Sequence, residues 1–208
     1  MAVFKGRTQI PYSYSCYGYT RGNGKTWHGG VDIVGIDDDT IYMPDYNGKS
    51  IEGTVVQSRI VVDKTNKTWE WGYYVSVKLD NNQTDDLVNW MYFCHCSKLL
   101  VKKGQKVKTG DALAIMGNTG NAAFNNPPYK HCHFEVRATA TGRGLNPCSY
   151  SGTSNAVGIY GSEQSSNANT KTQTITIGPV SNGDAMHIYN LCKSLGLTEQ
   201  GLYKAQYN

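Results

Sequence analysis

Residues 131–137 read His-Cys-His-Phe-Glu-Val-Arg, and the aromatic and β-branched residues in this run indicate a strand. Successive side chains of a strand point to opposite faces, so we expect His131 and His133 to point together toward one site while Cys132 points away. Two imidazoles on one face can act as metal ligands or as an acid and a base. This stretch therefore predicts a β-strand that carries a functional site.

A second cluster lies near the N-terminus. Residues 27–34 read WHGGVDIV, in which His28 and Asp32 form an H-x-x-x-D motif. Zinc favours neutral imidazole and carboxylate ligands, and a catalytic zinc site keeps one of its four positions for water. His28, Asp32 and one histidine of the 131/133 pair would supply the other three. The clustering of these residues favours a metal hydrolase.

A third cluster contains His95, between Cys94 and Cys96 in an aromatic run. Strand alternation places His95 on one face and both cysteines on the opposite face. We expect Cys94, Cys96 and Cys132 to be small buried hydrophobic residues rather than ligands, because free cysteine is among the most buried residue types. No disulfides are expected among the six cysteines of the chain.

Composition sets the broad class. The chain has 208 residues, of which 17% are charged and 39% hydrophobic, with 23 glycines and 15 tyrosines. Such a polar, turn-rich globular chain is expected to be mainly β. It contains no apolar run long enough for a membrane span. A net charge of +4 is far from the charge density typical of a nucleic-acid binder, so no nucleic-acid partner is expected.

Strands and turns follow from local patterns. Short runs rich in Val, Ile and aromatic residues, bounded by turn residues, are expected as strands at residues 31–34, 54–56, 60–62, 73–79, 89–93, 112–116 and 133–138. Residues 101–113 alternate and turn twice, which predicts a hairpin region. The five lysines between Lys98 and Lys108 are interpreted as a solvated face.

The C-terminal part has a different pattern. A Ser- and Asn-rich linker at residues 161–172 separates a domain at 1–160 from a small unit at 173–208. This unit is predicted as βαβ, with strands at 174–180 and 202–207. Between them, a capping box at 181–184 opens a helix and Gly196 ends it, with His187 on the polar side. A unit this small cannot bury a core alone, so we expect it to dock on the main domain or on a second copy, as a homodimer.

Several strings together resemble the lysostaphin-like family of zinc peptidoglycan endopeptidases. They are WHGGVDIV, YFCHCSKL at 92–99, KKGQKVKTGDALAIMGNTG at 102–120, and HCHFEVR, in the order of the family and within about residues 18 to 150. The resemblance implies a mainly β fold whose antiparallel sheets form a substrate groove. It also implies one Zn²⁺ per chain and hydrolysis of peptide bonds in bacterial peptidoglycan, either in the cross-bridge or in the stem peptide.

The resemblance also implies roles for single residues. The zinc ligands would be His28, Asp32 and His133, and the catalytic residues would be His95 and His131, with the general base left open between these two. Residues 118–130 form a longer connection than the usual short turn of the family. The groove wall is therefore expected to differ there.

Two other functions are weighed against this one. Residues 101–116 also resemble the hairpins of biotinyl and lipoyl carriers, but Gly117 follows Met116 where a lysine would carry the cofactor. A catalytically inactive wall-binding or scaffold homologue of the same fold is the alternative function. Inactive homologues usually lack ligands, whereas all five site residues are present here.

The first thirty residues show no Sec-type signal peptide. We therefore expect synthesis in the cytoplasm and action on the wall after release, as in a phage or prophage endolysin, or as part of a phage particle. An endolysin is favoured over a tail-associated hydrolase. Residues 175–197 of the C-terminal unit faintly resemble half of a peptidoglycan-binding repeat. Wall binding is a common role for such appendages, so it is favoured over self-association for this unit.

Overall fold

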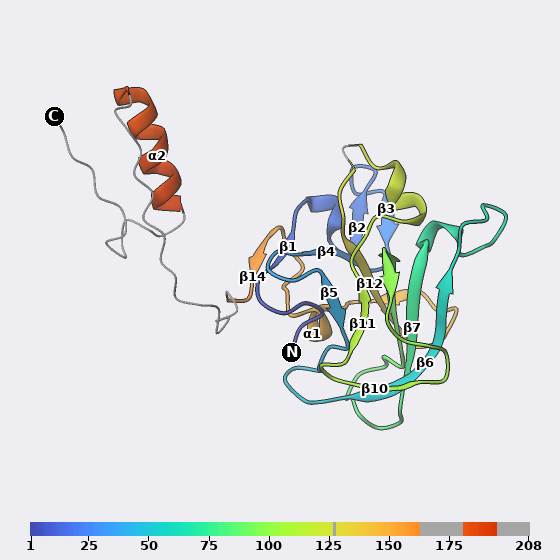
Figure 1. Ribbon diagram of the computed structural model, residues 1–208. Coiled ribbons are helices and arrows are strands. Elements are labelled where there is room, and N and C mark those ends of the chain that lie inside the picture. The colour runs from blue at the N-terminus through green and yellow to red at the C-terminus, as the bar shows by residue number, and fades with distance from the viewer. Residues whose placement is uncertain (127, 163–180, 195–208) are drawn as a thin grey trace. The chain divides into compact units, whose positions relative to one another are not determined.

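The computed structural model describes residues 1–126, 128–162 and 181–194 (Figure 1). The chain divides into two compact units, Met1–Ser165 and Ser166–Asn208. Both strands predicted for the C-terminal unit, the helix-ending Gly196 and most of the predicted linker lie outside the described residues. Within them, no helix has the length and apolar character needed to cross a membrane.

The first unit is built on a large antiparallel sheet, which confirms the mainly β prediction (Figure 1). Its strands, in spatial order, are β10 (Lys106–Lys108), β6 (Glu52–Ile60), β7 (Tyr73–Leu79), β8 (Trp90–Cys96), β12 (Cys132–Arg137), β4 (Val31–Gly35), β1 (Thr8–Ile10) and β14 (Gly158–Tyr160), with β13 (Gly144–Leu145) paired to β12. The strands that carry His95, His133 and Asp32, namely β8, β12 and β4, are therefore direct neighbours.

Two smaller sheets and short helices complete this unit. The smaller sheets are β5 (Thr40–Tyr42) with β11 (Ala112–Ile115) and β9 (Lys98–Leu99), and β2 (Gly18–Arg21) with β3 (Thr26–His28). The helices are the 3₁₀ turns η1 (Ser13–Ser15), η2 (Trp69–Trp71) and η3 (Gly120–Phe124), and α1 (Cys148–Ser151).

The hairpin predicted for residues 101–113 is wrong. The segment turns between β10 and β11, but β10 pairs with β6 whereas β11 pairs with β5 and β9. The pairs of β10 with β6 and of β11 with β5 join segments far apart in the sequence, and the nearer pair of β11 with β9 encloses the whole predicted segment. Local alternation shows that a segment is extended and does not show which strand it joins.

The core lies against one face of the central strands. Phe93 of β8 and Phe134 of β12 are paired in register, and their stacked rings, 5.1 Å apart, are fully buried. Ile33 of β4 and Cys132 belong to the same cluster. Since side chains alternate along a strand, the neighbours His133 and Asp32 point to the other face of the sheet.

In the second unit, the structure describes helix α2 (Asn182–Ser194). The predicted cap is confirmed: the hydroxyl of Ser181 accepts the backbone N–H of Asp184 at 3.2 Å and lies 2.6 Å from its carboxylate. His187 is exposed, as expected.

Candidate functional site

The site is built where β4 meets β12. The strands are antiparallel, with Asp32 opposite His133 in the register, so these two side chains lie side by side on one face. The two glycines before this pair allow the close approach. A Cβ on Gly30 would collide with the carbonyl of Phe134, and one on Gly29 would lie 2.8 Å from the Glu135 carboxylate. The glycines of the H-x-x-x-D motif thus position its two functional residues.

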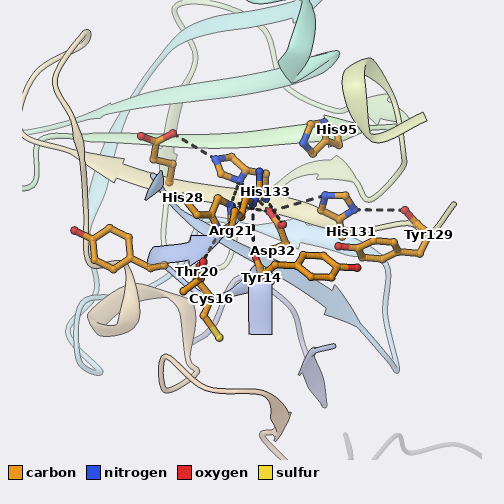
Figure 2. Close-up of polar contacts among 12 residues, drawn as sticks. Tyr14, Cys16, Thr20, Arg21, His28, Asp32, His95, Tyr129, His131 and His133 are labelled. Atoms are coloured by element: carbon orange, nitrogen blue, oxygen red, sulfur yellow. Dashed lines mark hydrogen bonds and ion pairs between the residues drawn. The ribbon is translucent and has the colours of Figure 1, made fainter. Parts of the chain in front are cut away.

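Three side chains converge on one point, as Figure 2 shows. Asp32 Oδ1 lies 2.9 Å from His133 Nδ1 and 3.1 Å from His28 Nε2, and the two nitrogens are 3.0 Å apart. His28 and Asp32 are buried, and the His133 side chain is 13% exposed. This is the one group of three or more potential ligand residues of this kind among the described residues.

Each of these groups uses its other polar atom elsewhere. His28 Nδ1 donates to the carbonyl of Cys16 at 2.8 Å, and His133 Nε2 lies 3.4 Å from Glu135 Oε2. Asp32 Oδ2 accepts from Arg21 Nη2 at 2.7 Å. These outer partners leave one imidazole nitrogen of each histidine and one carboxylate oxygen facing one another. Two nitrogens and one oxygen are a donor set that suits a divalent metal.

The charges of the site support the same conclusion. Burial would raise the pKa of the Asp32 carboxyl, but hydrogen bonds with His133 and His28 outweigh it and hold that pKa well below its ordinary value. Burial likewise opposes protonation of His133, yet the carboxylates of Asp32 and Glu135 raise its pKa to about 9. Without a metal, a protonated His133 thus lies between the carboxylates of Asp32 and Glu135. A bound cation would replace that proton at Nδ1.

Behind His133 lies an ion pair of Glu135 and Arg137. Arg137 donates from Nε to Glu135 Oε1 at 2.8 Å and from Nη2 to Oε2 at 3.0 Å. Although burial opposes ionisation of Glu135, its contacts with His133 and Arg137 lower its pKa to about 2. Glu135 is therefore an anion over the pH range in which most proteins are studied. It can hold His133 with its Nε2–H directed away from the group of His28, Asp32 and His133, which we call the ligand cluster.

His131 and His95 stand beside the cluster (Figure 2). His131 Nε2 is 3.9 Å from Asp32 Oδ1, and the rings of His131 and His95 are 4.9 Å apart. His95 Nδ1 donates to the carbonyl of Thr119 at 2.9 Å, which leaves its Nε2 with a lone pair. Burial is the largest cause that lowers the pKa of both histidines, to about 3 for His95. Both are neutral imidazoles able to accept a proton.

The face predicted for the cysteines around His95 is partly wrong. Alternation would place Cys94 and Cys96 on the same face, but Cys96 packs in the main core whereas Cys94 lies opposite His133 in a separate cluster. The cause is a bulge between β7 and β8: two residues of β8, Cys94 and His95, lie opposite one residue of β7, and His95 has a φ of 64°. Cys94, Cys96 and Cys132 are nonetheless all buried, as predicted.

The five predicted residues line one pocket of about 500 Å³. One part of the pocket wall is formed by residues 118–130, the connection predicted to be longer than the usual turn of the family. From η3 and the residues after it, this connection supplies Asn121, Ala122, Asn125 and Tyr129. Trp71 of η2 and Trp27 of β3 are further wall residues. Aromatic side chains of three elements thus lie in the same pocket wall as His28, Asp32 and His133.

The family model of Peptidase family M23 matches residues 27–147, more than half of the chain. The chain belongs to Peptidase family M23. An uncharacterised metalloprotease of Haemophilus influenzae is 42% identical over 55 residues, which are 26% of this chain and 10% of that protein. The matched segment thus spans about a tenth of that relative.

Solved structures of peptidase domains are also similar. A mutant catalytic domain of the prophage-encoded M23 protein EnpA from Enterococcus faecalis is 26% identical, with a TM-score of 0.44 and coverage of 64% of this chain and 85% of that one. The catalytic domain of the antimicrobial peptidase lysostaphin from Staphylococcus simulans is 21% identical, with a TM-score of 0.45 and coverage of 64% and 86%.

Sequence reasoning missed two residues of this M23 site. Glu135 is two positions after His133 on the same strand, so strand alternation could have placed it on the same face. No comparable sequence pattern predicts that Arg21 lies at the site. It reaches Asp32 because β2 pairs with β3 with a register shift between Tyr19 and Arg21, which the sequence does not reveal.

Proposed function

We propose that this M23 protein is a zinc-dependent endopeptidase that hydrolyses peptide bonds in bacterial peptidoglycan. The observation that carries the proposal is the convergence of His28 Nε2, Asp32 Oδ1 and His133 Nδ1 within 3.1 Å of one another, at the wall of an open pocket. The likeness of the sequence motifs to lysostaphin-like enzymes supports peptidoglycan as the substrate.

His28, Asp32 and His133 would hold the zinc ion through these three atoms. When bound, zinc polarises a peptide carbonyl and lowers the pKa of water toward neutrality. The fit rests on the chemistry of the donor set, because each ligand atom faces the other two while its second polar atom is engaged elsewhere.

His95 and His131 would move the protons of the reaction. Water attacks the carbonyl carbon, and one of the two neutral imidazoles accepts the proton that the water loses as the carbon–oxygen bond forms. A histidine then returns a proton to the amide nitrogen as the carbon–nitrogen bond breaks. The two rings, 4.9 Å apart, are close enough to act on the same bond.

The inactive-scaffold alternative is not favoured. A scaffold has no need for two neutral histidines beside three converging ligands, and all five of these side chains line the same pocket. Within the M23 family, the retained constellation supports an active enzyme.

The test is digestion of purified sacculi by the zinc-loaded protein. We expect new amino termini and soluble fragments whose masses identify one class of cleaved peptide bond, and no such products with Asp32→Ala. Intact sacculi after treatment with zinc-loaded protein, under conditions in which another peptidoglycan hydrolase digests them, would contradict the proposal.

We also propose a phage or prophage setting, with action on the wall as an endolysin or as a tail-associated hydrolase. The resemblance of the motifs to lysostaphin-like peptidoglycan endopeptidases supports it. Sequencing of the neighbouring genes tests it: a holin gene is expected beside an endolysin gene and tail genes beside a tail hydrolase, whereas chromosomal wall-maintenance genes would contradict both.

A further inference from the structure

The guanidinium of Arg21 lies directly on the ligand cluster (Figure 2). Its Nη2 atom is 2.7 Å from Asp32 Oδ2 and 3.0 Å from His28 Nε2, and its Nε donates to the carbonyl of Tyr14 at 3.2 Å. The Arg21 side chain is 39% exposed, whereas that of Asp32 is 3% exposed. Arg21 thus stands between the buried ligands and the open side of the pocket.

The contact with His28 has a chemical consequence. Because His28 Nδ1 donates its proton to the Cys16 carbonyl, Nε2 carries a single lone pair. That lone pair can accept the N–H of Arg21 or bind a metal, and it cannot do both. The contact with Asp32 is different, since Arg21 uses Oδ2 and leaves Oδ1 available.

We infer that Arg21 caps the metal site when no metal is bound, and that a metal must displace Arg21 from His28 in order to bind. This inference rests on the metal site of the proposed function. In the metal-free protein, the positive charge of Arg21 compensates the buried carboxylate of Asp32. Once a divalent cation is bound, the same charge repels it at short range. Arg21 therefore stabilises the metal-free protein and weakens its affinity for zinc.

Removal of a residue that merely supports a metal ligand changes zinc affinity in the opposite direction. If Arg21 served only to orient the Asp32 carboxylate, its loss would lower zinc affinity by about 10–100-fold, as for other residues that support metal ligands. The direction of the change in affinity therefore separates a cap from a support.

The experiment measures the zinc dissociation constant by competition with a chromophoric chelator. Arg21→Gln is expected to bind zinc roughly 10-fold or more tightly than the wild type, because the short-range repulsion is gone. Arg143→Gln is the matched control, since the Cζ of Arg143 lies 3.5 Å from the ring centroid of Trp27, which is a residue of the pocket wall. This control should leave zinc affinity unchanged.

A second readout needs no metal. Metal-free Arg21→Gln should unfold at a lower urea concentration than the metal-free wild type, and the difference should shrink when both proteins are loaded with zinc. If Arg21→Gln does not fold, Arg21→Lys takes its place. The compact ammonium retains the charge but cannot reproduce the contacts of the guanidinium, so a smaller gain in zinc affinity is expected.

Equal or weaker zinc binding by the folded Arg21 variant, beside a wild type that binds zinc, would overturn the inference and leave the proposed function intact. Absence of zinc binding in the wild type, Arg21→Gln and Arg143→Gln alike would instead overturn the proposed metal site. The two failures are therefore distinguishable.

Discussion

Glu135 lies directly behind His133, with Oε2 3.4 Å from Nε2, on the side of the imidazole that faces away from the ligand cluster. The carboxylate is anchored in turn by two hydrogen bonds from Arg137. This chain of contacts fixes the orientation of the ring and directs Nδ1 toward Asp32.

Glu135→Gln tests this support. The amide retains the shape but not the negative charge, so zinc affinity should fall by about 10–100-fold, measured by chelator competition. Glu70→Gln is the control, because Glu70 lines the same pocket from η2. Equal zinc affinities for Glu135→Gln and the wild type would show that the contact with His133 does not support metal binding.

His95→Ala and His131→Ala should separate catalysis from metal binding. Neither side chain belongs to the three-residue ligand cluster, so both variants should retain stoichiometric zinc while losing activity by about 10²-fold or more, the usual effect of removing a positioned acid or base. Activity is measured as the release of amino groups from sacculi. Near-normal turnover, or loss of zinc, in either variant would show that its role is assigned wrongly.

The buried His95 should make the metal-free protein sensitive to acid. Burial, together with the neighbouring His131 and His133, lowers its pKa to about 3, whereas its ordinary value is 6.5. Between these pH values the unfolded chain binds a proton that the folded chain does not, so this contribution to stability is lost as pH falls from 6.5 toward 3.

The measurement is urea unfolding at pH 7 and pH 4.5. His95→Asn, which tolerates the positive φ at this position, should lose less stability on acidification than the wild type. His187→Asn, on the exposed surface of α2, should behave like the wild type. The same acid-induced loss in His95→Asn as in the wild type would contradict the effect assigned to His95.

We propose that residues 173–208 form a wall-binding or self-associating unit. A chain that ends at Gly161 should then fold, bind zinc and cleave soluble peptides like the full chain, but bind sacculi more weakly, because tethering raises the local concentration of the site on the wall. Sacculus pull-down and light scattering distinguish wall binding from loss of a dimer. Misfolding of the shortened chain would show that the two-part division is wrong.

Much of the site could be predicted from the sequence because it depends on the two-residue period of strands. His131 and His133 share a face, and Cys132 packs in the core, as that period requires. The separation of His28 and Asp32 across two glycines is likewise a local feature. Asp32 meets His133 because β4 pairs with β12 in the register that places these two residues opposite each other.

The other features of the site and of the fold depend on contacts between distant segments, which no local sequence pattern predicts. The bulge at His95 changes which way Cys94 and Cys96 face, and it arises from how β8 pairs with β7. Strands of two or three residues, such as β9 and β13, are too short for alternation to be recognised. Arg21 reaches the site through a shifted strand pairing, so its place became visible only in three dimensions.

We propose that His28, Asp32 and His133 are the protein ligands of one zinc ion. The decisive measurement is elemental analysis of the purified wild type and of the single Ala variants, after dialysis against metal-free buffer. We expect one zinc per wild-type chain and loss of stoichiometric zinc in His28→Ala, Asp32→Ala and His133→Ala, with all three variants still folded. Full zinc occupancy in Asp32→Ala or His133→Ala would contradict it.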